Sequence, residues 1–243
     1  MLRVYVDATT IEPLERLLKS MQRQKMDIIK ITVISNEISQ LEEFKNKFDF
    51  EIIKIEKDIV STLNQLIRKN DTDYFIIASS NQILGVNFAE TVDGLVEKYD
   101  GLIFNISKIR TTGVFCDVYN KKCHTVYDAM KTRPVIQSGV FRTDIVNANN
   151  LVLKSFSLSG QINYLKKYFE YCENSYYCSE VLSYIDNLSE TTKPSLGYVL
   201  RCDAYMKGVI KASINDILYS TLKKPFIRKF RKKIRNIIRK LKE

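Results

Sequence analysis

Apolar and polar positions alternate along the first hundred residues with two periods. Short β-branched apolar runs, typical of buried strands, occupy residues 2–6, 28–34, 50–55, 73–78 and 101–106. Between these runs, apolar residues recur at steps of three and four, which predicts amphipathic helices over residues 11–21, 38–48, 59–67 and 88–99. We expect Thr10 to cap the first helix, with Pro13 in its first turn.

This alternation predicts an α/β sheet. Strands that are joined by single helices and short turns pair in parallel, because each connection must cross over the sheet. Beyond Lys108 the pattern breaks into shorter pieces, which are residues 114–119 and 138–145, a helix over 162–172 and a strand over 176–185. We therefore expect one continuous domain, with a mainly parallel twisted sheet, helices on both faces and a mixed second half.

The composition narrows the class of protein. Of the 243 residues, 45% are hydrophobic and 27% are charged, which is typical of a folded domain with a sizeable core. We find no signal-peptide start and no apolar run near the roughly 20 residues of a membrane-spanning helix. The five cysteines form no C-x-x-C pair, which favours a reducing compartment over a disulfide framework. Since His124 is the single histidine, a His-rich zinc site is nearly excluded.

The net charge of +10 is concentrated at the end of the chain. Residues 223–243, here termed the basic tail, hold eleven Lys or Arg and one acid, whereas residues 1–222 hold 27 of each sign. Apolar residues follow Pro225 at steps of three and four, which predicts a helix with one apolar face and bases around the rest. We expect membrane contact from Phe226, Arg228, Lys229, Phe230, Arg231, Lys232, Ile234, Arg235, Ile237, Ile238, Arg239 and Leu241.

A bilayer interface suits both parts of this helix. Anionic headgroups attract each base by roughly 1 kcal/mol, and the apolar face enters the acyl boundary. The alternatives are docking of the basic tail on this chain or on a protein partner, and RNA binding. RNA would match the charge but would leave the aliphatic face unexplained, and aromatic residues for base stacking are scarce there. We therefore expect an anionic membrane surface as the partner, and no nucleic acid.

Six segments in chain order resemble the inverting glycosyltransferases of family 2, which have the GT-A fold. They are residues 17–24 (LLKSMQRQ), 31–36 (ITVISN), 60–67 (VSTLNQLI), 73–84 (DYFIIASSNQIL), 138–145 (SGVFRTDI) and 176–185 (YYCSEVLSYI). The resemblance covers residues 2–195 and implies a GT-A glycosyltransferase-like domain over 1–195. A helical extension over 196–222 and the basic tail over 223–243 would follow it.

The positions that carry the family's chemistry are neutral in this chain. Where a family member has acids for the base and ribose at the end of its second strand, this chain has Ser35 and Asn36. Ser79 and Asn81 replace the D-x-D element, whose carboxylates hold Mg²⁺ or Mn²⁺ against the diphosphate. Gln161 stands at the general-base position, and an amide takes no proton near neutral pH.

One carboxylate remains near the expected nucleotide pocket. Asp7 ends the first predicted strand, and its alternative role is that of an acid at the entry of the following helix. Asp7, Ser35, Asn36, Ser79 and Asn81 would then form a weak or vestigial nucleotide site, with a nucleotide sugar as a further expected ligand. We expect no metal, no cofactor and no catalytic residue at this site.

Together, the resemblance and these departures predict a catalytically degenerate glycosyltransferase-like protein. The basic tail would hold it at the cytoplasmic face of the cell membrane. There it would be a partner or scaffold for an active glycosyltransferase, or for a second copy of itself, in the synthesis of a bacterial cell-surface polysaccharide or teichoic-acid-type glycan. One alternative is an active metal-independent transferase, with Asp7 or another acid as base and a lipid-linked or polymer acceptor. The other is a membrane- or RNA-binding module without a nucleotide site.

Overall fold

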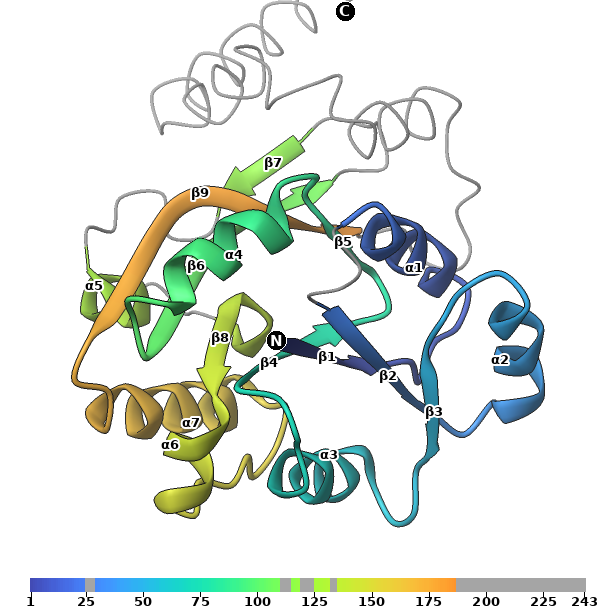
Figure 1. The fold of residues 1–243 in the computed structure, drawn as a ribbon, viewed down its shortest axis with the longest axis horizontal. Helices are drawn as coiled ribbons and strands as arrows, with labels where there is room; N and C mark the ends of the chain where they lie inside the picture. Colours follow the sequence, from blue (N-terminus) through green and yellow to red (C-terminus); the bar gives the residue numbers. More distant parts are fainter. Residues whose placement is uncertain (25–28, 110–114, 119–124, 132–134, 187–243) are drawn as a thin grey trace, which may run out of the picture.

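A computed structural model describes residues 1–24, 29–109, 115–118, 125–131 and 135–186 (Figure 1). The expected helical extension over 196–222, the basic tail over 223–243 and His124 lie outside the described residues. Within the described residues, none of the helices is both long enough and apolar enough to span a membrane.

The described chain forms one nine-stranded sheet with helices on both faces. The strands are β1 (Leu2–Asp7), β2 (Ile29–Ser35), β3 (Glu51–Lys54), β4 (Tyr74–Ser79), β5 (Gln82–Leu84), β6 (Gly101–Ile109), β7 (Phe115–Val118), β8 (Gly139–Arg142) and β9 (Ser175–Asp186). The helices are α1 (Leu14–Gln22), α2 (Ile38–Lys45), α3 (Ile59–Arg68), α4 (Phe88–Val96), α5 (Val126–Lys131), α6 (Thr143–Ala148), α7 (Leu158–Glu170) and the 3₁₀ helix η2 (Ile136–Ser138).

The strand order is β3-β2-β1-β4-β8-β6-β9-β5, with β7 beside β6. The first four strands are parallel, as the sequence predicted, and Val4 of β1 lies in register between Ile31 of β2 and Ile76 of β4. In the second half β8 runs antiparallel to both β4 and β6, while β6 and β9 are parallel. The predicted change from a parallel to a mixed half is therefore confirmed.

The sheet grows in two directions from β1. Strands β2 and β3 lie on one side of β1, whereas β4 and the later strands lie on the other side. Open α/β sheets bind ligands outside the carboxyl ends of their strands, at the point where the strand order reverses. In this chain that point lies between β1 and β4, whose last residues, Asp7 and Ser79, are register partners.

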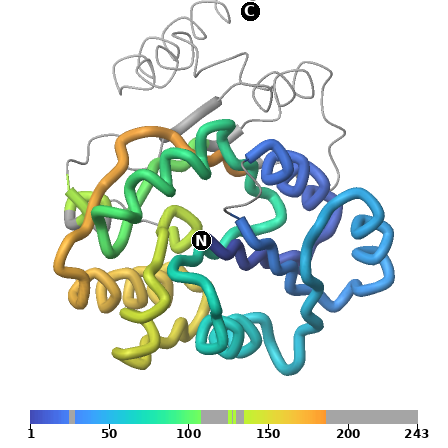
Figure 2. Tube along the Cα trace, viewed as in Figure 1, coloured from blue at the N-terminus to red at the C-terminus, as the bar shows by residue number. Residues whose placement is uncertain are grey.

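Each face of the sheet has its own apolar core. One core packs α1, α2 and α4 against the sheet, and the other packs α3, α5, α6 and α7 against the opposite face. Neighbouring strand residues alternate between the two cores, since Val4 belongs to the first and Tyr5 to the second. Figures 1 and 2 show α3, α6 and α7 together along the lower border of the molecule, with α1 and α4 in the upper half of the view.

Phe141 of β8 lies at the centre of the second core. Its side chain is fully buried, and its ring centroid lies 5.3 Å from that of Phe75, 5.5 Å from Tyr164 and 5.0 Å from Tyr168. Packing is so close at the start of β6 that a Cβ added to Gly101 would lie 2.6 Å from Tyr168 Cε1. A glycine is therefore required where α7 crosses this strand.

Several element boundaries differ from the prediction. The cap predicted at Thr10 is wrong, because α1 begins at Leu14 with Pro13 as its N-cap. The residues before it form a turn, in which the Leu14 N–H donates to the Ile11 carbonyl over 2.8 Å. Helix α7 begins at Leu158, earlier than predicted, and the Ser157 hydroxyl caps it by accepting from the Gly160 N–H.

The segment predicted as one piece over residues 138–145 is divided in three. It contains the end of η2, the strand β8 and the start of α6. Strand β8 is short because its register partners on β6 extend only from Gly101 to Ile103. The 3₁₀ helix η2 directly precedes β8 in the chain and lies against both β4 and β6.

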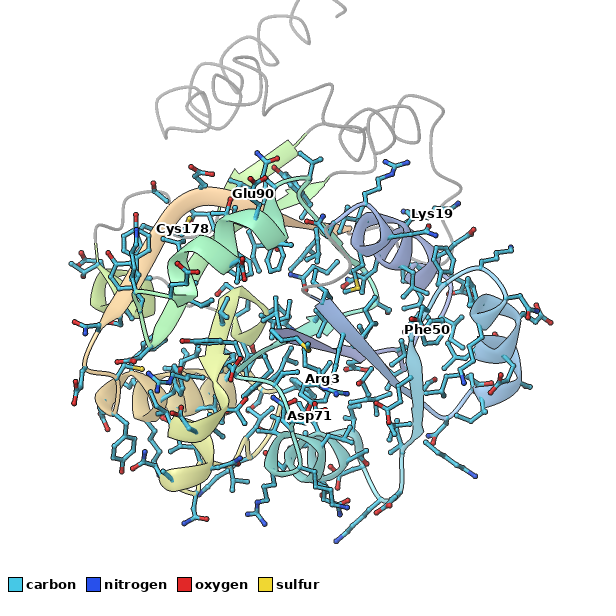
Figure 3. All side chains as sticks on the ribbon, viewed as in Figure 1. Arg3, Lys19, Phe50, Asp71, Glu90 and Cys178 are labelled. Atoms are coloured by element: carbon cyan, nitrogen blue, oxygen red, sulfur yellow. The ribbon has the colours of Figure 1, made fainter. Side chains whose placement is uncertain are left out.

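Ion pairs close the amino-terminal end of the first strands. The Arg3 guanidinium lies 3.1 Å from a Glu51 oxygen and 2.7 Å from an Asp71 oxygen, and Lys30 lies 2.9 Å from the other Asp71 oxygen (Figure 3). Hydrogen bonds from Lys30 and Arg3 lower the pKa of Asp71 to about 2. Arg3 and Lys30 are therefore held in ion pairs at the end of the strands opposite to Asp7.

Candidate functional site

Polar side chains end three neighbouring strands at the carboxyl edge of the sheet. Asp7 ends β1, Ser35 ends β2 with Asn36 just after it, and Ser79 ends β4 shortly before Asn81. These five residues are termed the strand-end cluster. The sequence predicted them as a nucleotide site, and the sheet register brings them to adjacent strand ends.

The Ser35 side chain is buried and forms hydrogen bonds with the backbone. Its buried hydroxyl donates to the Ala8 carbonyl over 2.8 Å and accepts from the Glu37 N–H over 3.1 Å. The first of these bonds joins the end of β2 to the residue that follows β1. Asn36 beside it is exposed. Of this pair, only Asn36 is placed to contact a ligand directly.

Asp7, Ser79 and Asn81 are partly exposed at the point where the strand order reverses. Asp7 Oδ1 accepts from the Thr9 N–H over 3.1 Å, so the carboxylate holds the turn after β1 and does not cap α1, which begins later. The Asp7 carbonyl accepts from the Ser80 N–H over 2.9 Å, and the Ser79 hydroxyl donates to Asn81 Oδ1. These bonds fix the turn between β4 and β5 against the end of β1.

Gln161, at the predicted base position, is a structural link. It is buried in the first turn of α7, where Oε1 accepts from the Ile136 N–H over 2.9 Å and Nε2 donates to the Phe156 carbonyl over 2.6 Å. The amide thereby joins η2 to the segment that precedes α7. Because η2 lies against β4, Gln161 is connected to the strand-end cluster through that short helix.

The sequence analysis did not identify two further buried amides, Gln82 of β5 and Asn105 of β6. Gln82 of β5 donates from Nε2 to Ser183 Oγ over 2.8 Å and to the Gln137 carbonyl over 3.4 Å. Asn105 of β6 donates to the Ser179 carbonyl over 2.6 Å, at the register shift between β6 and β9. Each interrupts or borders an apolar run, and a polar residue in such a run is the signal that could have identified them.

The electrostatic character of the strand-end cluster is set by one carboxylate among neutral groups. Across the described part of the chain, no group of three or more His, Cys, Asp or Glu side chains could hold a metal ion. Lys54, the register partner of Ser35, ends β3 and lies two strands from Asp7, which corresponds to about 10 Å at the usual strand spacing. Lys57 follows it, beside Asp58.

Comparison with known proteins gives matches to solved structures. No protein-family model and no curated protein matches the chain. S. aureus TarS, residues 1–349 in complex with UDP-GlcNAc, has a TM-score of 0.66 and 13% sequence identity over 79% of this chain. The same part of TarS in another structure covers 90% of this chain, with a TM-score of 0.63 and 12% identity. The chain spans 60% of the length of the first of these structures and 78% of the second.

A second protein extends the comparison. The mannosyltransferase PcManGT from Pyrobaculum calidifontis, in complex with GDP-Man and Mn²⁺, has a TM-score of 0.51 and 12% identity. The match covers 93% of this chain and 71% of PcManGT. At such identities the likeness concerns the fold. The parallel half, the mixed half and these structural neighbours together show that this chain has the GT-A-like glycosyltransferase fold that the sequence predicted.

Proposed function

We propose that this chain is a catalytically degenerate glycosyltransferase-like protein that works at a membrane surface. It would be a partner or scaffold in the synthesis of a cell-surface glycan. The observation that carries the proposal is the hydrogen bonding of Ser35 and Gln161, each of which both donates to and accepts from the backbone. An ionised carboxylate only accepts, so an acid at either position would face a backbone carbonyl.

The composition of the strand-end cluster also supports the loss of metal chemistry. Mg²⁺ and Mn²⁺ prefer anionic oxygen ligands, and the leaving diphosphate of a nucleotide sugar needs its charge offset. Ser79 and Asn81 offer a hydroxyl and an amide at the strand end where the family carries carboxylates. Neutral groups in their place avoid the repulsion that crowded carboxylates would have without a metal ion.

The first prediction concerns nucleotide-sugar binding by the purified full-length protein. Calorimetric titration with UDP-GlcNAc and GDP-Man, each with and without Mn²⁺, should show no metal-dependent binding. Metal-dependent binding followed by sugar transfer would overturn the proposal. Binding without metal that is lost on Asp7→Asn would favour the alternative of an active metal-independent transferase, and turnover of a labelled donor would then decide between the two.

The membrane role rests on the sequence of the basic tail. Replacing Arg231, Lys232 and Arg235 by Gln should weaken association with vesicles of mixed anionic and neutral lipid by roughly a hundredfold at low salt. The estimate takes about 1 kcal/mol for each base near the surface. Vesicle co-sedimentation measures the effect, which should shrink as the salt concentration rises.

A matched control separates the tail from general surface charge. Replacing Lys47, Lys69 and Lys166, three exposed lysines of the sheet domain, by Gln removes the same charge. This control should bind vesicles nearly as well as the wild-type chain. If deletion of residues 223–243 leaves vesicle association intact, the interfacial helix is wrong, and the alternatives of a protein partner or a different membrane contact take its place.

A further inference from the structure

The strand-end cluster has the chemistry of a site for hydroxyl groups. Asn36 is exposed and Asp7, Ser79 and Asn81 are partly exposed, with Ser35 buried beside them. They offer one carboxylate, one hydroxyl and two amides. A carboxylate oxygen can accept more than one hydrogen bond, and the Ser79 oxygen can still accept while its proton is donated to Asn81 Oδ1. This set can pair with the adjacent hydroxyl groups of an uncharged sugar ring.

The same cluster is a poor match for a diphosphate. A diphosphate beside β1 and β4 would face the Asp7 carboxylate at close range. Arg3 and Lys30 are held in ion pairs at the opposite end of the strands. Lys54 ends β3, two strands from Asp7, and the backbones of these residues are about 10 Å apart at the usual strand spacing.

The cluster is held in place before any ligand arrives. Thr9 fixes one oxygen of the Asp7 carboxylate, and Ser79 fixes Asn81 Oδ1. The bond from the Ser80 N–H to the Asp7 carbonyl holds the two strand ends at a constant separation. Prearranged groups lose less conformational entropy on binding. Because each hydrogen bond to a sugar hydroxyl is weak, this smaller cost favours a measurable affinity.

We propose that the strand-end cluster binds an uncharged saccharide unit through Asp7, Ser79 and Asn81. The ligand class is a neutral hexose or N-acetylhexosamine within a glycan. This inference rests on the proposed function and specifies it further. A protein that has lost the metal and nucleotide chemistry of its fold would keep the site at the sheet edge as a contact for the glycan under synthesis.

The test uses the full-length protein and saturation-transfer NMR. The probes are the methyl glycosides of glucose, mannose and N-acetylglucosamine, with UDP as a charged competitor. We expect saturable binding of at least one glycoside, which UDP does not displace. The double variant Ser79→Ala/Asn81→Ala should weaken that binding by about tenfold, through loss of two hydrogen-bonding groups. Asn147→Ala, an exposed amide of α6, is the control and should change nothing.

Three results would overturn the inference. They are the absence of saturable glycoside binding by the folded protein, binding that the double variant leaves unchanged, and displacement of the glycoside by UDP. If the double variant does not fold, Asp7→Asn keeps the shape of the side chain and should also weaken binding. Mn²⁺-dependent binding of a nucleotide sugar followed by sugar transfer would contradict the proposed function itself. If the protein binds neither glycosides nor nucleotide sugars, only the saccharide inference is contradicted.

Discussion

Replacement of Gln161 by Glu should lower the free energy of unfolding by about 3 kcal/mol at neutral pH. The buried amide donates to the Phe156 carbonyl over 2.6 Å and accepts from the Ile136 N–H over 2.9 Å. An ionised Glu keeps the second bond but points a charged oxygen at the Phe156 carbonyl. Burial without a donor for the charged form raises the pKa of the new carboxyl in the folded state.

The penalty should depend on pH. A protonated Glu has one O–H donor and one carbonyl acceptor, which can replace the two hydrogen bonds that Gln161 makes. A folded-state pKa raised above the unfolded value of about 4.3 leaves stability intact below that pH. The stability is then lost as the pH rises through the raised folded-state pKa. Urea unfolding at pH 4.5 and pH 7.5 should therefore show a small loss at the lower pH and the full loss at the higher.

Two control variants make this prediction specific. Gln65→Glu places the same charge on the exposed side of α3 and should cost little at either pH. Gln161→Leu removes both hydrogen bonds without adding a titrating group, so its loss of stability should be the same at both pH values. Equal penalties for Gln161→Glu at pH 4.5 and pH 7.5 would show that this side chain does not hold η2 as described.

Replacement of Phe141 by Ala should destabilise the fold by about 3–5 kcal/mol, the largest effect that we expect from a single truncation. The ring is fully buried and contacts Phe75, Tyr164 and Tyr168 in the second core. These partners come from β4 and α7, so the ring packs β8 against both elements. Removing the ring leaves a cavity that rigid strands cannot fill.

Denaturant unfolding measures this effect, with Tyr171→Ala as the control. Tyr171 follows α7 and its side chain is 51% exposed, so its truncation should change the free energy of unfolding by about 0.5 kcal/mol or less. A loss below about 1 kcal/mol for Phe141→Ala would mean that the second core is packed differently from the arrangement described.

Much of the fold could be predicted from the sequence because side-chain periodicity is a local property. The four parallel strands and their helices each have an apolar face that is readable within ten residues. Boundaries were less well predicted. Thr10 and Pro13 are both plausible helix starts locally, and the turn from Ile11 to Leu14 decided between them.

The sequence predicted which residues of the candidate site lie on neighbouring strand ends, but not their hydrogen-bond partners. That Asp7 and Ser79 meet follows from parallel pairing, because the carboxyl ends of parallel strands share an edge. The roles of Ser35 and Gln161 could not be predicted, since both face backbone groups of other segments. Gln161 contacts Ile136, 25 residues away, and Gln82 contacts Ser183 across 101 residues.

The sequence by itself determined which segments form the strands β1 to β4 and the helices α1 to α4, and which ends of these strands are polar. The tertiary structure alone decided that β8 enters between β4 and β6, that η2 fills the space beyond it, and that Ser35 and Gln161 serve the backbone. The physical reason is the separation along the chain over which each effect acts. Burial periodicity acts between neighbours in the chain, whereas a hydrogen-bond partner is set by whichever distant segment the closed core brings within about 3 Å.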